Sequence, residues 1–427
     1  MRLGGDYIAK CGVSGKLAGT VAFMYARDLQ LNFSDQRAAD AAWTAHCGHP
    51  VQNVKVSTLS SLTGIRAFAA LWVVLYHYII VEFMHPEFGL ATLSNGHYAV
   101  DLFFILSGFI LSYNYYDKLA IFSLKKCFDF MEKRFARLYP IHIICFLLSL
   151  GMYILLLVQG GKPQSDQSYS LFSAVLNILM LQSWWPGLAL NWNFVSWSIS
   201  AEWFAYSVIF LFALNYWRRW PMSIRFLVVV GLAIWNSYQE PGHWVPLPLL
   251  RISYGFLLGV LIYNFKPAAQ RWCLTGRRID LLLTAVFALV FALVSLPALA
   301  SLLVFLVPLF GLMIGLLACN KGVWVSFFSL RPVVYLGEIS YSLYMFHGLI
   351  YKIALQAQHR TVFFQQLSPW SNLLLWTIVS QVVAGCAYRW LELPGRTLIL
   401  RQFANIRPTM QVFYKRIGAA LSALLLK

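Results

Sequence analysis

The chain is dominated by a succession of apolar runs, each long enough to cross a lipid bilayer or nearly so. A helix of about 20 predominantly apolar residues spans the hydrocarbon core. Hydrophobic residues make up 59% of the 427 residues and charged residues only 11%, which is too apolar for a soluble globular protein of this length. We therefore predict an all-α, polytopic membrane helical bundle of about ten transmembrane helices. The predicted spans are 65–84, 99–116, 137–158, 196–216, 224–238, 249–265, 279–296, 299–319, 338–357 and 371–391.

Basic side chains are in large excess, with 33 Lys and Arg against 16 Asp and Glu and a net charge of +17. In a soluble protein this excess would suggest nucleic acid, but here the basic residues collect in short loops between apolar runs, as the positive-inside rule describes. We therefore expect no nucleic-acid partner and place both termini in the cytosol. The seven cysteines are scattered and predict neither a disulfide framework nor a metal site.

The composition changes along the chain and divides it into three parts. Residues 1–56 predict a poorly ordered cytosolic extension, residues 57–395 hold the membrane domain, and residues 396–427 form a basic cytosolic tail. Within the membrane domain, charge bias favours a re-entrant or interfacial segment at 171–185 over an additional span. The stretch 119–134 mixes apolar and charged residues and predicts an amphipathic helix on the cytosolic surface. That helix is either a basic lip around an opening or an ordinary connector.

The first apolar run contains an arginine at its entry and a histidine further along, Arg66 and His77. Eleven steps of roughly 100° return the two side chains to nearly the same helix face, about 16 Å apart along the axis. Ionisable residues inside a membrane usually face a protein or water-filled interior and mark a pathway or reaction site. This helix is therefore the first candidate for function.

His77 is the leading candidate for a general base, because imidazole titrates near neutrality. Asp101, at the start of the next span, is the candidate to orient it. That contact requires the second span to start deep in the membrane. Ser107 and Gly108 lie in the middle of the same span, and Gly108 permits close approach of either another helix or a ligand.

Arg134 and Arg137 lie three residues apart at the cytosolic end of the third span, on one helix face. Together with Arg66 they are suited to binding phosphate groups. The competing interpretation is that they only anchor the helix end on the cytosolic side.

An outward-facing acceptor site is predicted at Trp197, Glu202 and Trp203, where a carboxylate lies among aromatic rings in an apolar helix. Sugar-binding sites combine flat aromatic faces with a few polar groups, although an interfacial aromatic belt has the same composition. His347, in the run 338–357, is a second buried histidine, to which we assign support or substrate binding rather than catalysis.

Five short motifs occur in order along the chain, and each of them alone is a weak signal. They are Arg66 with His77 ten residues further on, Asp101–Phe109, Arg134–Pro140, Trp197–Glu202 and Ser340–Tyr344. As a set they closely resemble the acyltransferase family 3 membrane proteins, over residues 59 to about 395. This resemblance implies transfer of an acyl group, usually acetyl, from cytosolic acyl-CoA to a hydroxyl of a cell-envelope or exported carbohydrate.

The resemblance places the family's Arg-to-His motif on Arg66 and His77. Arg66, Arg134, Arg137, Ser107 and Gly108 would then bind acyl-CoA, with no tightly bound cofactor, in a multi-pass protein of the bacterial inner membrane surrounded by lipid. His77 would act either as a base or as the acyl carrier. A transporter or flippase of a lipid-linked glycan is the alternative from another class, because it would also need buried polar residues around a central path.

Overall fold

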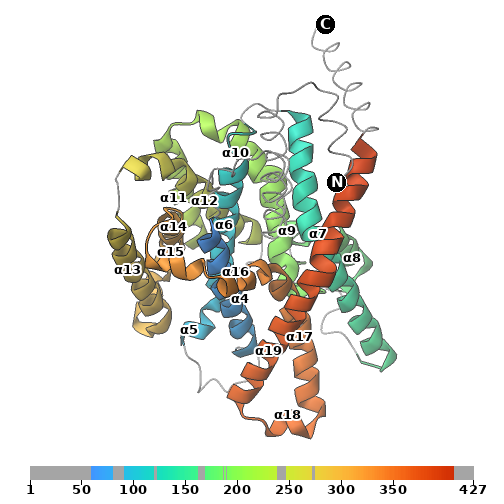
Figure 1. The fold of residues 1–427 in the computed structure, drawn as a ribbon. Coiled ribbons are helices and arrows are strands. Elements are labelled where there is room, and N and C mark those ends of the chain that lie inside the picture. The colour runs from blue at the N-terminus through green and yellow to red at the C-terminus, as the bar shows by residue number, and fades with distance from the viewer. Residues whose placement is uncertain are drawn as a thin grey trace, which may run out of the picture. The chain divides into compact units, whose positions relative to one another are not determined.

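The computed structural model describes residues 59–79, 91–119, 123–161, 169–185, 187–188, 190–237, 247–271 and 275–407. These residues form helices and connecting turns without any strand (Figure 1). The predicted extension at 1–56 and the tail residues 408–427 lie outside them. The α-helices are α4 (Ser60–Tyr78), α5 (Ala91–Ser94), α6 (Ala99–Tyr115), α7 (Leu124–Val158), α8 (Leu171–Ile178), α9 (Trp197–Phe204), α10 (Leu211–Asn215), α11 (Met222–Ser237), α12 (Leu247–Arg271), α13 (Gly276–Ser295), α14 (Leu306–Leu317), α15 (Val323–Phe328), α16 (Arg331–Glu338), α17 (Ser340–Arg360), α18 (Val362–Gln366) and α19 (Pro369–Ala387).

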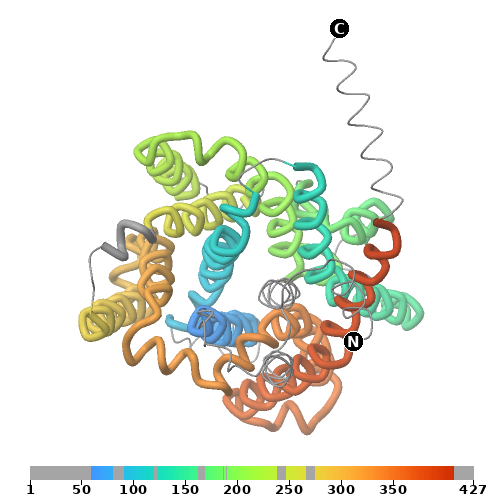
Figure 2. The backbone as a smooth tube through the Cα atoms, turned by 45° about the horizontal axis from the view of Figure 1, so that its top comes forward, coloured from blue at the N-terminus to red at the C-terminus, as the bar shows by residue number. Residues whose placement is uncertain are grey.

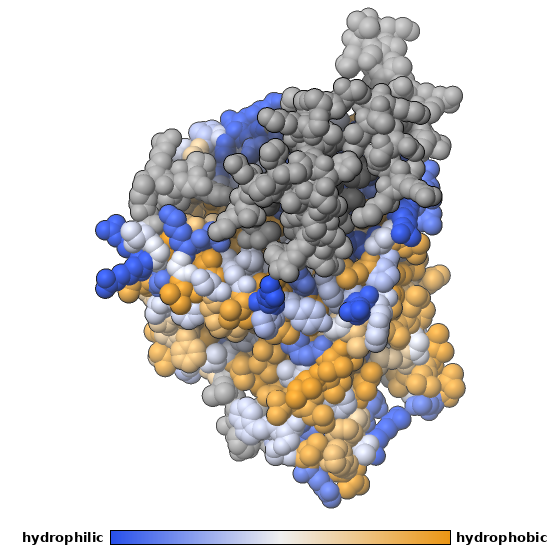
Figure 3. Space-filling model, in the orientation of Figure 1, coloured by the Kyte–Doolittle hydropathy of each residue, from blue (hydrophilic) through white to orange (hydrophobic). Residues whose placement is uncertain are grey.

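Seven helical segments in the described part of the chain are long and apolar enough to cross a membrane. They correspond to seven of the predicted spans, and α11, with 16 residues, is apolar but shorter. The segments are Ala91–Tyr115, Leu124–Val158, Phe194–Arg219, Leu247–Phe265, Gly276–Ser295, Pro297–Leu317 and Pro369–Arg407. A hydrophobic band covers the middle of the visible surface, with hydrophilic residues above and below it (Figure 3). Apolar side chains on α7 and α13 are also exposed.

The two helices that carry the predicted histidines, α4 and α17, are not among the seven apolar segments. Both are long enough to span, with 19 and 21 residues, but both contain several polar side chains. Every residue from Ile339 to Tyr351 is buried, so the first half of α17 is surrounded by protein on all sides. In Figure 2, α4 and α6 likewise lie inside a ring formed by the later helices. The polar residues are therefore in the interior of the bundle and away from its lipid-like surface.

Two predicted helices differ in extent from the observed ones. The amphipathic surface helix expected at 119–134 is, from Leu124, the first part of the single 35-residue helix α7, which continues through Pro140 to Val158. α4 begins at Ser60, before the predicted start at 65, and His77 lies in its last described turn and not at its centre. Residues 80–84 of that predicted span lie outside the described residues.

The segment 171–185 contains the eight-residue helix α8 followed by a short 3-10 helix, Gln182–Trp184. Eight residues are too few to cross the hydrocarbon core. The last helix continues from α19 through a π-helical turn, Tyr388–Glu392, and on to Arg407, where its guanidinium donates to both carboxylate oxygens of Glu132 on α7. Part of the predicted tail is thus helical and contacts α7.

Glycines allow α6 and α12 to pack in backbone contact. A Cβ atom built on Gly108 would lie 2.0 Å from the carbonyl oxygen of Phe256, and one built on Gly259 would lie 2.1 Å from that of Ile105. Small residues of this kind let membrane helices approach closely. Gly108 is therefore a packing residue that faces α12, and it is not among the residues that line the cavity described below.

We expect Gly259→Ala to lower the stability of the protein by roughly 1–3 kcal/mol, because the new methyl group forces the two helices apart. The measurement is the midpoint of thermal unfolding in detergent. Gly231→Ala on α11 is the matched control, since no atom lies within 4 Å of its added Cβ. Equal midpoints for the two variants would contradict the proposed packing.

Candidate active site

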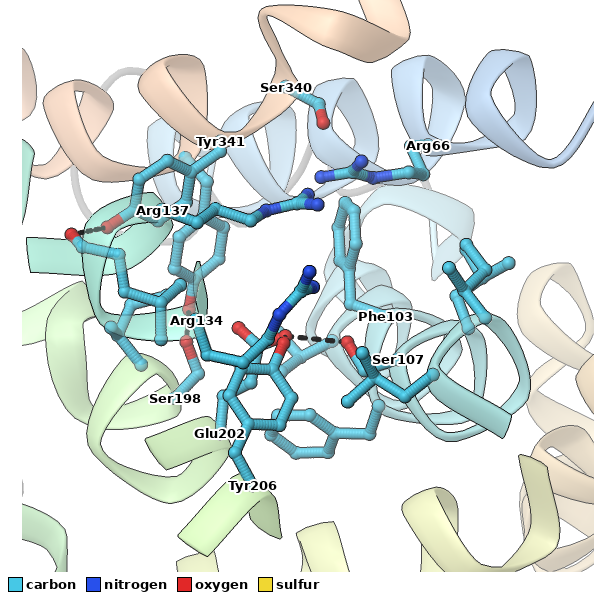
Figure 4. A pocket seen from close by; sticks show the side chains of 18 residues that line it. Arg66, Phe103, Ser107, Arg134, Arg137, Ser198, Glu202, Tyr206, Ser340 and Tyr341 are labelled. Atoms are coloured by element: carbon cyan, nitrogen blue, oxygen red, sulfur yellow. Dashed lines mark hydrogen bonds between the residues drawn. The ribbon is translucent and has the colours of Figure 1, made fainter. Parts of the chain in front are cut away.

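Three arginine side chains converge on one internal cavity of about 80 Å³. Arg66 comes from the second turn of α4, and Arg134 and Arg137 come from successive turns of α7. Figure 4 shows the three guanidinium groups directed to the same space. The volume is enough for several water molecules. The other polar side chains that line the cavity are Ser107, Ser198, Glu202, Tyr206, Ser340, Tyr341 and Tyr344.

The three guanidinium groups have almost no polar protein partners. Across the described residues, Arg66 and Arg137 make no hydrogen bond, and no carboxylate oxygen lies within 4.0 Å of any of the three groups. Arg134 is only 5% exposed, yet it makes one long hydrogen bond of 3.4 Å, to the Tyr115 hydroxyl, and its Nε has no partner. Buried charges in proteins are normally paired. The cavity is therefore suited to an anionic ligand.

Glu202 lies in the same cavity but is bound to hydroxyl groups. Its Oε1 accepts a hydrogen bond of 2.6 Å from Ser107 Oγ and another from the Tyr206 hydroxyl. Ser107 comes from α6, and the dashed line in Figure 4 marks its bond to Glu202. These bonds hold the carboxylate against the wall formed by α6 and α9.

The predicted acceptor site at Trp197, Glu202 and Trp203 is not assembled. Trp197 stacks over the guanidinium of Arg251 at 5.6 Å, and Trp203 packs edge-on against Phe135 at 5.9 Å. The reason is helical geometry, because residues five apart point about 140° away from each other and adjacent residues about 100°. Glu202 therefore belongs to the arginine cavity and not to a separate site with the two tryptophans.

His77 contacts His347 on α17. His77 Nδ1 lies 2.9 Å from the carbonyl oxygen of Val73 and 3.2 Å from His347 Nε2. The ring of Phe194 covers the same histidine, with ring centroids 5.2 Å apart. The sequence singled out both histidines, but the contact between them joins α4 to a helix 270 residues further on and depends on the tertiary packing.

Asp101 is paired with Arg251, and its predicted contact with His77 does not occur among the described residues. Both oxygens of Asp101 accept hydrogen bonds of 2.7 Å from Arg251, which also donates to the carbonyl oxygen of His97. Arg251 lies near the start of α12, the helix that packs directly on α6. The close packing of α6 and α12 brings the two opposite charges together.

Tyr344 lies between the cavity and the histidine pair. Its ring lines the cavity and lies 5.6 Å from the ring of His347. Its hydroxyl accepts a hydrogen bond from Ser198 and donates one to the carbonyl oxygen of Val195. The arginine cavity and His347 are thus neighbouring parts of one region, and the Tyr344 ring contacts both.

Two residues with clear roles in this geometry were missed from the sequence, Tyr206 and Arg251. Tyr206 follows Glu202 by four residues, a spacing that places both on one helix face and would have identified the pair. The sequence offered little indication of the role of Arg251, because Arg251 lies beside Asp101 only as a result of the way α6 and α12 pack together.

Taken together, the structure shows an apolar helical bundle with a cavity lined by three arginines near a pair of histidines. A family model described as an acyltransferase domain matches residues 59–389. The chain belongs to this family, acyltransferase family 3.

Curated relatives agree with this family. Residues of the chain are 34% identical to acyltransferase MdmB of Streptomyces mycarofaciens over 185 residues, which cover 42% of this chain and 45% of that protein. O-acetyltransferase OatA of Staphylococcus aureus is 22% identical over 397 residues, which cover 84% of this chain and 60% of OatA. The chain thus spans about half the length of MdmB and somewhat more of OatA. No solved structure matches the chain.

We expect Asp101→Leu to destabilise the protein by about 3–5 kcal/mol, because it leaves the charge of Arg251 buried without its partner. The midpoint of thermal unfolding in detergent measures the loss. The double variant Asp101→Leu with Arg251→Leu should recover much of it, since no unpaired charge remains. A double variant as unstable as the sum of the two single variants would contradict the pairing.

Proposed function

We propose that this chain is a membrane O-acyltransferase that moves an acyl group, most simply acetyl, from acyl-CoA to a hydroxyl of a cell-envelope or exported carbohydrate. The observation that carries the proposal is the set of three arginines without carboxylate partners beside a pair of histidines, on helices that share the interior of the bundle. The protein would act in the bacterial inner membrane.

Acyl-CoA fits the chemistry of the arginine cavity. Its nucleotide part carries phosphate groups, and the planar guanidinium is the side chain best suited to bind them through paired hydrogen bonds. Arg134 is buried, and Arg66 and Arg137 are partly buried. Cations withdrawn from water without a carboxylate partner are costly unless a ligand compensates their charge. Binding the phosphates at Arg66, Arg134 and Arg137 would satisfy all three groups at once.

The spacing along α4 relates this binding site to the reaction site. Arg66 and His77 are about 16 Å apart along the helix axis. Coenzyme A carries its thioester at the end of a long, flexible pantetheine arm, remote from its phosphates. With the phosphates held at the arginines, the arm would extend past Tyr344 towards His77.

At His77 the chemistry would be general-base catalysis. The imidazole accepts the proton of the sugar hydroxyl while the hydroxyl oxygen attacks the thioester carbonyl. The carbon–sulfur bond then breaks, and the proton passes from the imidazolium to the departing thiolate. The products are the acylated sugar and free CoA.

A glycan transporter or flippase remains the alternative function, since the arginine cavity would also accept the diphosphate of a lipid-linked glycan. The two functions differ in what they require of the chain. An acyltransferase needs His77 and consumes acyl-CoA, whereas a transporter moves its substrate without acyl-CoA. The test is the release of free CoA by the purified protein, reconstituted in vesicles with labelled acetyl-CoA and envelope glycan, together with mass analysis of the glycan.

We expect His77→Ala to abolish acylation of the glycan while the amount of protein in the membrane stays normal, because the base is lost and the fold is kept. Acylation is followed by mass analysis of surface glycans from cells that carry either form. His359→Ala, at an exposed position of α17, is the control and should acylate normally. Normal acylation by the His77 variant would remove this residue from the mechanism.

We expect Arg66→Ala to raise KM for acetyl-CoA roughly 10- to 100-fold, as one lost charge-assisted hydrogen bond predicts, with a smaller change in kcat. The comparison with 3′-dephospho-acetyl-CoA identifies the phosphate concerned. A variant of Arg66, Arg134 or Arg137 that no longer distinguishes the two donors has lost the contact to the 3′-phosphate.

Arg331→Ala, which removes an exposed arginine, is the matched control for these measurements. Its KM for both donors should equal that of the unchanged protein. Acetyl-CoA kinetics that are unaltered in all three cavity variants would refute the donor site.

A further inference from the structure

His77 and His347 are joined by a hydrogen bond whose direction follows from their other partners. His347 Nδ1 lies 2.6 Å from the carbonyl oxygen of Tyr344, and His77 Nδ1 lies 2.9 Å from that of Val73. A carbonyl oxygen can only accept a hydrogen bond, so each Nδ1 must carry a hydrogen. The remaining contact joins His77 Nδ1 and His347 Nε2, at 3.2 Å.

The burial of His347 determines whether its Nε2 carries a hydrogen. Its side chain is 0% exposed, and no carboxylate contacts it in the described part of the chain, so the neutral form is strongly favoured. A neutral imidazole with a hydrogen on Nδ1 has a lone pair on Nε2. His347 Nε2 is therefore the acceptor, and the N–H of His77 is shared between it and the carbonyl of Val73.

We propose that His347 is a positioning residue that fixes His77 with its Nε2 unprotonated and available to react. This inference rests on the proposed function, because it assigns the reacting atom of that reaction. When His77 Nε2 takes a proton, the ring becomes an imidazolium whose Nδ1–H donates more strongly. His347 Nε2 and the carbonyl of Val73 then stabilise the charge, in the way that an acceptor behind a catalytic histidine generally does.

The surroundings of His347 hold it in place for this role. Asn193 donates a hydrogen bond of 3.0 Å to the carbonyl oxygen of Met345, one turn before Gly348. A Cβ atom on Gly348 would lie 2.9 Å from the Asn193 side chain, so α17 and the segment before α9 are in close contact here. The Tyr344 hydroxyl is held by Val195 in the same segment and by Ser198 in the first turn of α9. Movement of the imidazole away from His77 is therefore restricted.

The first test determines which ring nitrogens of His77 and His347 carry a hydrogen. The full chain, labelled with ¹⁵N-histidine and reconstituted in lipid, is examined by solid-state NMR, with His77→Gln and His347→Gln samples to assign the signals. We expect Nδ1 protonated and Nε2 unprotonated at both histidines. A hydrogen on His77 Nε2 overturns the inference, and this result is independent of whether the protein acylates a glycan.

The second test replaces His347 with amide side chains, each of which places a polar atom where one of the two imidazole nitrogens lies. A glutamine at 347 reaches as far as His347 Nε2 and can accept from His77, whereas an asparagine reaches only as far as Nδ1. We expect His347→Asn and His347→Phe to lower kcat about 10- to 100-fold with KM for acetyl-CoA unchanged. His347→Gln should retain kcat within about threefold of the unchanged protein, and His359→Gln on the same helix is the control.

The split between kcat and KM distinguishes a positioning role from a general structural one. Equal losses in the glutamine and asparagine variants, or a KM that rises with the fall in kcat, overturn the proposal. An unchanged protein that releases no CoA and acylates nothing instead refutes the proposed function, while the NMR result still decides the state of His77.

Discussion

The fold depends on placing charged and polar side chains in the interior of a bundle whose outside is apolar. A cation facing lipid is costly, so arginine and histidine must point inward to partners, water or a ligand. The chain meets this constraint by surrounding α4 and the first half of α17 with more apolar helices. Close contacts at glycines such as Gly108 and Gly259 make the enclosure tight. The position of the candidate site follows from this arrangement, because the enclosed helices carry its polar groups.

The candidate site has two neighbouring parts, and α4 contributes to both. Arg66 faces the cavity, and His77 faces α17 about three turns further on. Tyr344 separates the two parts while its backbone carbonyl accepts from His347. A substrate whose charged and reactive ends are far apart suits this layout, because each end meets a different chemistry. In the proposed function, one rigid helix would set the distance between the donor-binding arginines and the reacting histidine.

The sequence predicted the helical class and most of the apolar spans, because hydropathy is a local property. It also singled out the arginines and histidines, since ionisable residues stand out in an apolar run. It did not predict their partners. Asp101 contacts Arg251, and His77 contacts His347, only because helices far apart in sequence pack together.

Two assignments from the sequence were wrong. α7 was divided into a surface helix and a span, because the charged residues around Lys133 resemble a surface segment, although the helix is continuous. Glu202 was assigned to the tryptophans through sequence proximity, which ignores the direction of side chains around a helix.

The contrast between the arginines of this chain supports the proposal that the cavity binds an anionic donor. Arg251 is bound to Asp101, Arg407 to Glu132, and Arg225 to the Asn264 side chain and two backbone carbonyls. The fold therefore pairs arginines where their role is structural. Glu202 lies in the same cavity, but its Oε1 accepts hydrogen bonds from Ser107 and Tyr206, and among the described residues it forms no ion pair with the three guanidinium groups. Leaving three cations together without an ion pair lowers stability, and the proposed function accounts for this cost, because a cavity that binds an anionic donor must also release it in every catalytic cycle.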